Sequence, residues 1–480
     1  MVAGLALSTG LAQAGPWVDQ GDVGLRHDLQ LLADGGVLTV PLTTWPLAWG
    51  DLIGEINAAE SAELNPAEYA ALKRVQRRMR AETRLGSRAR FRASWADNPV
   101  QLRTFEATPR EEEELSAGLE WTGERFAFRA QGTVVKDPQD DESTRLDGSY
   151  AGVALGNWML SANALDRWWG PGWEASQILS NNARPIPAVM IERNSSRPFK
   201  TPWLSWLGPW KLVVFNGFLE KERNDYAEPM LFGARFTFKP WQSLELGLSR
   251  TAMWGGDGRP QDWDAFWNML IGNDNRYQPG TSITPENEPG NQLAGYDLRW
   301  APGWPSRHYA VYAQYIGEDE KNHLPYRFLD LLGAEFWGGF SNGWSWRVHA
   351  EYTETRAEST FDYAYNHFGI YSDGYRYYGR CIGNSMDNDG RQRSLGLTLA
   401  DTRDGVWSLL LRSVELNGDD DGLNSLTPIE LYMTDVHVSH QRDLFGGRLS
   451  LGLGWYELED PDTHETDDDT NAYVQWSMNY

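Results

Sequence analysis

The chain has 480 residues, a formal net charge of −24 and one cysteine, Cys381. The single cysteine excludes an intramolecular disulfide and a cysteine-based zinc cluster, and the negative charge argues against nucleic acid, whose phosphates it would repel. Many aromatic residues, with 24 Trp, 20 Tyr and 17 Phe, accompany a mean hydropathy of −0.54, and no run approaches the ~18 to 20 apolar residues of a spanning helix. Any membrane location must therefore be by a β-barrel, whose lipid belt and polar lumen match this composition.

The first part of the chain has two patterns of its own. Residues 1–14 (MVAGLALSTGLAQA) have the apolar core and the Ala-x-Ala cleavage site of a secretory signal, although they lack its basic start. Leucines at helical spacing then precede Gly35, a second helix follows Pro46, and a third begins at the N-cap Asn65. We expect residues 15–83 to form a periplasmic bundle of about three helices. It would plug the barrel, offer a docking face to a periplasmic partner, or act only as a stabilising cap.

From residue 84 onward the hydrophobic period is two, the period of a strand with one apolar face. In the clearest case Trp346 and Val348 alternate with Arg347 and His349. Eighteen such segments are found, an even number, as bacterial barrels require. They lie near residues 85–95, 115–121, 126–134, 148–155, 157–165, 187–194, 211–219, 232–238, 244–248, 292–300, 308–316, 330–338, 344–353, 393–400, 405–415, 430–440, 449–455 and 471–480. The last segment would pair with the first and so remove both exposed edges.

The connections between these segments alternate in length. Those assigned to the outer side are long, and those assigned to the periplasmic side are mostly short, as in outer-membrane barrels. The inner connection Ser195–Pro209, rich in Pro and Trp, is an exception that the pattern does not explain. The sequence predicts an all-β fold: a transmembrane antiparallel β-barrel of about 18 strands over residues 84–480, located in the outer membrane.

Aromatic residues are unusually dense in three of the predicted outer loops, where solvent normally disfavours them. Flat rings beside Asp, Asn and Arg suit a sugar, whose CH face stacks while its hydroxyls seek polar partners. Alternatively, the rings pack the loops into a lid or belong to the aromatic girdle. The candidate glycan-contacting residues are Trp168, Trp169 and Trp173 in the third loop, Trp254, Trp263, Trp267 and Tyr277 in the fifth, and Tyr363, Tyr365, Tyr371, Tyr375, Tyr377 and Tyr378 in the seventh.

The sequence offers no clear catalytic constellation. His437 and His440 would lie on opposite faces of a strand, unlike a metal-binding helix pair, and no phosphate-binding loop or EF-hand spacing is present. A hydrolase at the barrel rim that uses His367 and nearby acids is a third hypothesis, for which a polar rim is the simpler account. We expect no enzymatic activity, no cofactor and no metal.

Several ungapped runs give the chain a family resemblance. Asp166–Trp173 (DRWWGPGW), Ser180–Pro185 (SNNARP), Thr201–Pro209 (TPWLSWLGP) and Pro289–Gly295 (PGNQLAG) resemble the Wzi-type capsule assembly proteins, as do Pro41–Pro46 and Leu248–Ala252. The resemblance implies an eighteen-stranded outer-membrane barrel with a periplasmic helical bundle. It also implies a lectin-like protein that binds capsular or extracellular polysaccharide and holds it at the cell surface. It does not transfer individual sugar-contacting residues.

The sequence leaves open whether the barrel conducts and how it would bind an acidic glycan. The leading alternative to a lectin is a porin or diffusion channel. Polysaccharides of the resembled family are often acidic, whereas the chain carries a charge of −24; the glycan would then be neutral, bound through local arginines, or bridged by cations. The other expected partners are outer-membrane lipid and lipopolysaccharide.

Overall fold

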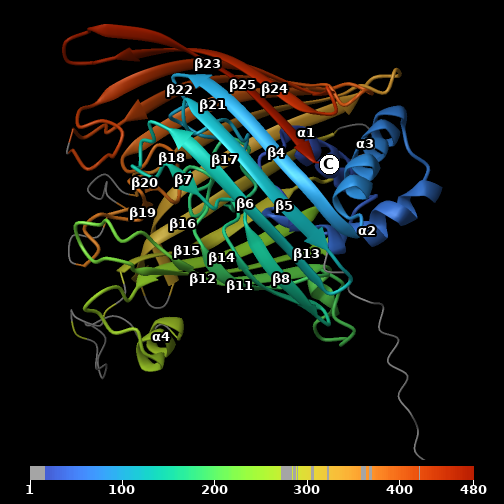
Figure 1. Ribbon diagram of the computed structural model, residues 1–480, viewed down its shortest axis with the longest axis horizontal. Coiled ribbons are helices and arrows are strands. Elements are labelled where there is room, and N and C mark those ends of the chain that lie inside the picture. The colour runs from blue at the N-terminus through green and yellow to red at the C-terminus, as the bar shows by residue number, and fades with distance from the viewer. Residues whose placement is uncertain are drawn as a thin grey trace, which may run out of the picture.

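A closed antiparallel β-barrel organises the chain (Figure 1). The structure is a computed structural model that describes residues 17–271, 284, 288, 290–303, 308–321, 324–357, 364–366, 370–420 and 422–479. Within these residues, eighteen strands of six residues or more complete the ring, and the two-residue strand β7 adds to one edge of β6. The predicted signal segment, residues 1–14, lies outside the described residues, as do Tyr277, Tyr363 and His367.

The barrel strands follow the chain in order around the ring. They are β4 (Gly86–Asp97), β5 (Glu113–Thr122), β6 (Phe126–Lys136), β7 (Thr144–Arg145), β8 (Tyr150–Leu155), β9 (Trp158–Asn163), β11 (Ala188–Arg193), β12 (Trp210–Phe218), β13 (Met230–Trp241), β14 (Leu244–Trp254), β15 (Gly290–Trp300), β16 (Tyr309–Lys321), β17 (Leu324–Gly339), β18 (Ser345–Glu354), β21 (Gly390–Ala400), β22 (Val406–Leu416), β23 (Leu431–Leu444), β24 (Gly447–Glu459) and β25 (Thr466–Asn479). The last strand pairs with β4, which places Trp476 opposite Ala93. The predicted closure and the predicted number of strands are confirmed.

Shorter elements occupy the two ends and the interior of the barrel. The helices are α1 (Val23–Asp34), α2 (Trp49–Ala58), α3 (Pro66–Glu82) and α4 (Trp263–Leu270), with 3₁₀ turns η1 (Ala59–Ser61) and η2 (Ser205–Leu207). The two-residue strands are β1 (Trp17–Val18), β2 (Thr44–Trp45), β3 (Leu47–Ala48), β10 (Trp168–Trp169), β19 (Arg376–Tyr377) and β20 (Arg380–Cys381). None of the described helices has the length and apolarity to cross a membrane.

Helices α1, α2 and α3 gather at one end of the barrel, which we call the helix end; α4 and the hairpin β19–β20 lie at the other, the loop end (Figure 1). The Asn65 side chain caps α3 by accepting from the Ala67 and Glu68 amides at 3.0 Å. Helix α1 is buried almost throughout, and Nε2 of His27 lies 2.9 Å from Oγ of Ser345 on the inner face of β18. Helix α1 therefore closes the helix end.

The third loop, residues 164–187, meets the N-terminal segment inside the barrel. Strand β10 of this loop pairs with β2, so that Trp168 lies opposite Trp45. On the barrel wall Arg235, which is 1% exposed, donates to Oγ1 of Thr44 at 2.8 Å and pairs with Asp297 at 2.6 Å. Segments from both ends thus fill the lumen with a hydrogen-bonded core.

The connection that the sequence pattern left unexplained, Ser195–Pro209, is anchored to the helix end. Ser196 donates from its amide and its hydroxyl to the Asp51 carboxylate of α2 at 2.7 and 2.9 Å. Beyond this anchor, Trp203 and Trp206 are 72% and 61% exposed. The segment therefore presents tryptophans outward while its start is tied to the bundle.

Candidate functional site

Three of the seventh-loop tyrosines that the structure describes belong to the interior of the protein. Tyr365, Tyr371 and Tyr375 are fully buried. Their hydroxyls donate to the carbonyl oxygens of Gln177, Gly255 and Ile178 at 2.7, 2.9 and 3.0 Å, respectively. Burial raises the pKa of all three phenols, so the rings stay neutral donors. These three rings pack the seventh loop onto the third and fifth loops as a lid, the alternative that the sequence left open.

The third-loop tryptophans are also part of the interior. Trp168, Trp169 and Trp173 are no more than 4% exposed. Nε1 of Trp173 donates to Glu335 at 3.0 Å, and the Arg26 guanidinium of α1 lies 4.1 Å from the centre of a Trp173 ring. A sugar could reach these rings only if the interior opened.

The three described tryptophans that were predicted in the fifth loop lie over the outer face of the barrel wall, and Trp254 is the last residue of strand β14 rather than a loop residue. Trp254 is 8% exposed and donates from Nε1 to Asn216 at 3.0 Å. Trp263 and Trp267 belong to α4 and are exposed. Of the glycan candidates that the structure describes, Tyr377 and Tyr378 line a cavity at the loop end.

The hairpin β19–β20 explains how Tyr378 is presented. Its two turn residues, Tyr378 and Gly379, have φ angles of 48° and 73°, the left-handed conformation that a two-residue hairpin turn requires. The turn holds Tyr378 edge to face with Tyr377, with ring centres 4.7 Å apart. Tyr377 is buried and Tyr378 is half-buried. A rigid turn therefore places one aromatic ring at the rim of the cavity.

The cavity beside this turn, which we call the mouth cavity, holds about 320 Å³ between the first, second, third, seventh and eighth loops, within the size range of small-molecule sites. Four arginines and two carboxylates line it: Arg103, Arg110, Arg184 and Arg380, with Glu111 and Asp140. Both carboxylates already pair with Arg145, at 2.6 and 2.7 Å, and Asp140 also pairs with Arg184 at 2.7 Å. The mouth cavity is therefore locally basic in a chain of charge −24.

Two of these arginines have neutral partners. Arg380 donates to the side chain and carbonyl of Gln101 at 3.0 and 2.7 Å and to Oδ1 of Asn182 at 3.0 Å. Arg103 donates to the carbonyls of Thr108 and Pro109 at 2.7 and 3.1 Å. Burial, reinforced by the charge of Arg110, lowers the pKa of Arg380 to about 10 and that of Arg103 well below its usual value. Among the described residues, neither arginine has a carboxylate within ion-pair distance. An anionic group of a ligand would therefore supply the negative charge that both guanidinium groups lack.

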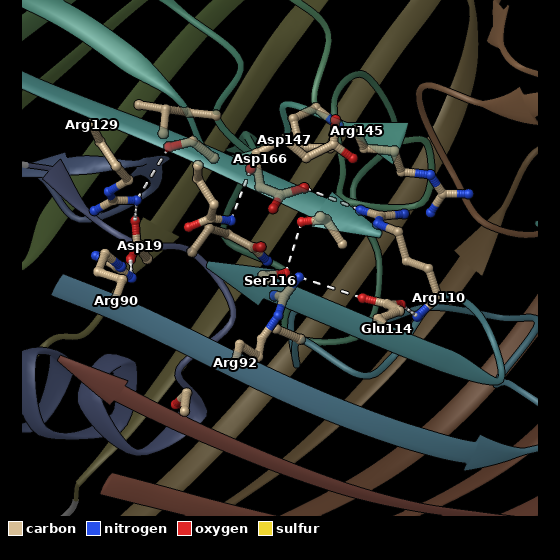
Figure 2. Close-up of a pocket in the computed structure, with 18 of the residues that line it drawn as sticks. Asp19, Arg90, Arg92, Arg110, Glu114, Ser116, Arg129, Arg145, Asp147 and Asp166 are labelled. Carbon is tan, nitrogen blue, oxygen red and sulfur yellow. Dashed lines mark hydrogen bonds and ion pairs between the residues drawn. The ribbon is translucent and has the colours of Figure 1, made fainter. Parts of the chain in front are cut away.

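A second cavity of about 170 Å³, the lumen cavity, lies deeper in the barrel (Figure 2). Arg103 and Arg110 line both cavities. Figure 2 shows Asp19 between Arg90 and Arg129. Its carboxylate pairs with these two arginines at 2.6 and 2.8 Å, respectively. Burial opposes ionisation of Asp19, but these two guanidinium groups hold its pKa below the usual range. Seven arginines and four carboxylates line the lumen cavity, so the basic character continues inward from the mouth.

Comparison with known proteins identifies the family. The family model described as capsule assembly protein Wzi matches residues 81–473. The chain belongs to the Wzi family. It is 31% identical over 473 residues to an uncharacterized 55.8 kDa protein in the cps region of Klebsiella pneumoniae, covering 95% of this chain and 89% of that one.

A solved relative has the same architecture. Wzi of Escherichia coli, an outer membrane protein involved in group 1 capsule assembly and a carbohydrate-binding β-barrel, superposes with a TM-score of 0.81 at 27% identity. The match covers 96% of this chain and 99% of that one. As a Wzi family member with the same closed barrel, this chain is an outer-membrane protein.

The arginines of the mouth cavity were not singled out from the sequence. Arg103 and Arg110 lie in the first loop and Arg380 in the seventh, and no local spacing connects them. Only the Tyr378-Gly379 turn carries a local signal, since glycine after a residue at positive φ marks a two-residue hairpin. Closure of the ring is what brings the first and seventh loops together.

Proposed function

We propose that this protein binds capsular or extracellular polysaccharide at the cell surface and attaches or organises it there. The observation that carries the proposal is the mouth cavity, where an aromatic ring on a rigid turn lies beside arginines whose partners are neutral, in a chain of a capsule assembly family. The carbohydrate binding of the Escherichia coli relative supports the same role.

The side chains of the mouth cavity would contact different parts of a sugar. The Tyr378 ring would stack on the CH face of a sugar. Arg380 and Arg103 would donate to its hydroxyl or acidic groups, because guanidinium groups provide several donors in a fixed fork. Of the three ways in which the negative charge of the chain could fit a surface glycan, local arginines are thus the one that the mouth cavity favours.

Binding without catalysis is part of the proposal. No histidine or cysteine is among the described residues that line the mouth cavity, and its two carboxylates, Glu111 and Asp140, are both held in ion pairs with arginines. The rim hydrolase hypothesis rested on His367, which lies outside the described residues.

The orientation that fits this role places the loop end outside the cell and the helix end in the periplasm. The outward apolar side chains of the barrel would then contact outer-membrane lipid and lipopolysaccharide. At the helix end, Tyr69 of α3 is 55% exposed beside Lys73, whose ammonium lies 5.2 Å from the ring centre. This part of α3 is the face that a periplasmic partner would use.

Binding of polysaccharide extracted from the producing cells tests the proposal. The purified full-length protein should bind it, and R380Q should weaken that binding while leaving heat-modifiable gel mobility, the sign of a folded barrel, unchanged. The matched control is R403Q, which removes the same charge from an exposed turn at the helix end. Failure of the unaltered protein to bind, or equal loss in both variants, would refute the role of the mouth cavity.

A diffusion channel is the alternative that the filled lumen disfavours. The third loop and the N-terminal segment pair inside the barrel through β2 and β10, and their side chains occupy the cross-section. We therefore expect purified protein in planar bilayers to give no large steady current. A sustained porin-like conductance would instead support a diffusion channel over a closed binding protein.

A further inference from the structure

Helix α4 packs against the outer face of the barrel wall. Its residue Met269 is 1% exposed and clusters with Phe232, Ala252 and Trp254. Phe266 adds ring contacts, with centres 5.8 Å from Phe232 and 5.3 Å from Trp254. On β13 the inward position is that of Arg235, which contacts Thr44 in the lumen. Because strand side chains alternate, Phe232 points outward, and α4 lies outside the ring of strands.

An arginine on the same outer face holds the C-terminal end of α4. Arg250 of β14 donates to the carbonyl oxygens of Met269 and Leu270 at 2.9 and 3.2 Å. A cation at this end satisfies carbonyls that have no partner in the helix and interacts favourably with the helix dipole. At the other end, Asp262 caps the helix through the Ala265 amide at 2.8 Å. The helix is thus capped at both ends, and its C-terminal end is tied to the wall by Arg250.

A second apolar face of α4 is left uncovered. Trp263, Trp267 and Leu270 follow one another at the i, i+4, i+7 spacing of a helical stripe and are 69%, 48% and 37% exposed. The two indoles stack with ring centres 6.3 Å apart. This stripe continues the outward apolar surface of β13 and β14, which is the lipid-facing surface of an outer-membrane barrel.

The same sector of the barrel carries exposed tryptophans at its helix end as well. Trp203, Trp206 and Trp241 are 72%, 61% and 67% exposed. At ~3.3 Å per residue and a strand tilt of ~40°, the stretch from Phe232 to Trp241 rises about 23 Å along the barrel axis. That height is close to the ~25 Å apolar band between the two aromatic girdles of such barrels.

We propose that α4 is a membrane-surface helix whose Trp263 and Trp267 rest in the headgroup region of the outer leaflet. Lipid is the occupant because the exposed stripe is continuous with the lipid-facing wall and ends in indoles, whose amphipathic rings favour this interface. Trp203 and Trp206 of the Ser195–Pro209 connection form the matching belt at the helix end. The two tryptophans of α4 thus anchor the barrel in lipid, and glycan binding is left to the mouth cavity.

Site-specific quenching of a bimane label tests this assignment. In a C381S background, bimane on W267C is compared with the label on L248C, an outward wall position, and on S425C, an exposed position that lines the mouth cavity. The proteins are reconstituted in dioleoylphosphatidylcholine vesicles that contain 5-doxyl phosphatidylcholine, or are exposed to aqueous iodide. Heat-modifiable mobility confirms folding, and W263C is the second variant should W267C fail to fold.

The label on W267C should be quenched by the doxyl lipid several-fold more than the label on S425C, and as strongly as that on L248C. Iodide should quench the S425C label most. Quenching of the W267C label by iodide alone would overturn the proposal by placing α4 in water. Protection from both quenchers would overturn it in favour of a second copy of the chain covering the helix.

Discussion

The inner and outer faces of the barrel wall carry opposite kinds of side chain. On β17 and β18, Glu335 and Arg347 point into the lumen and are fully buried, whereas Phe336 on the other face is 55% exposed. The same strands thus carry a polar core inside and an apolar surface outside, the reverse of a soluble protein. Charge pairing therefore holds the interior together, while the exterior needs lipid to cover it.

The largest predicted effect comes from removing one charge from the interior. Glu335 pairs with Arg299 and Arg347, both at 2.5 Å, so E335A would leave buried guanidinium groups without part of their compensation. Removing one partner of a buried pair typically costs ~3 to 5 kcal/mol. A urea refolding titration in lipid should show this loss of unfolding free energy.

The matched control for E335A is D404A. Asp404 pairs with Arg77 at 2.6 Å, but both side chains are partly open to solvent, where such pairs contribute only ~0 to 1 kcal/mol. Similar costs for the two variants would contradict the view that the interior depends on buried charge pairs.

The next effect concerns the outer face. Val348 lies between the inward Arg347 and His349 and points outward, as its alternation in the sequence predicts. V348R should lower the unfolding free energy by ~2 to 4 kcal/mol if the residue lies near the bilayer midplane. S341R, in an exposed turn at the helix end, adds the same charge in water and should change little; equal costs would mean that this face does not meet lipid.

A smaller effect should separate the lid from the mouth cavity. The Tyr375 hydroxyl donates to the Ile178 carbonyl at 3.0 Å, and its oxygen also lies 3.0 Å from Oγ1 of Thr251. Y375F leaves a buried carbonyl without this donor, which typically costs ~1 to 3 kcal/mol. Y378F, at the half-buried rim, should be close to neutral in the same titration. A neutral Y375F would mean that the lid does not contribute to stability.

The smallest effect is expected in binding. Y378A removes the ring at the rim of the mouth cavity and should weaken polysaccharide binding by ~0.5 to 1.5 kcal/mol, borrowing the scale of aromatic pairs, or up to roughly tenfold. Y69A removes an exposed tyrosine from the helix end and should leave the affinity unchanged. Equal affinities in both variants would remove Tyr378 from the site.

The barrel can be predicted from the order of residues alone. The alternation of outward Val348 with inward Arg347 and His349 identifies a strand without reference to any neighbour, because side chains on a strand point to opposite faces by local geometry. The same local rule placed even the weakest predicted segments, near 148–155 and 187–194, which are β8 and β11. Capping likewise marked the start of α3 at Asn65.

The roles of the inward residues and of the loop residues, in contrast, follow from contacts that no local pattern contains. The period of two could not distinguish a watery lumen from a packed one, and His349 in fact lies 2.6 Å from Glu174 and stacks on Trp173. Nor could aromatic density tell the buried Tyr375 from the rim residue Tyr378, or a ring at the mouth from one on the wall such as Trp267. These distinctions depend on contacts between segments far apart in the chain, such as Arg380 with Gln101, and such contacts exist only once the ring has closed.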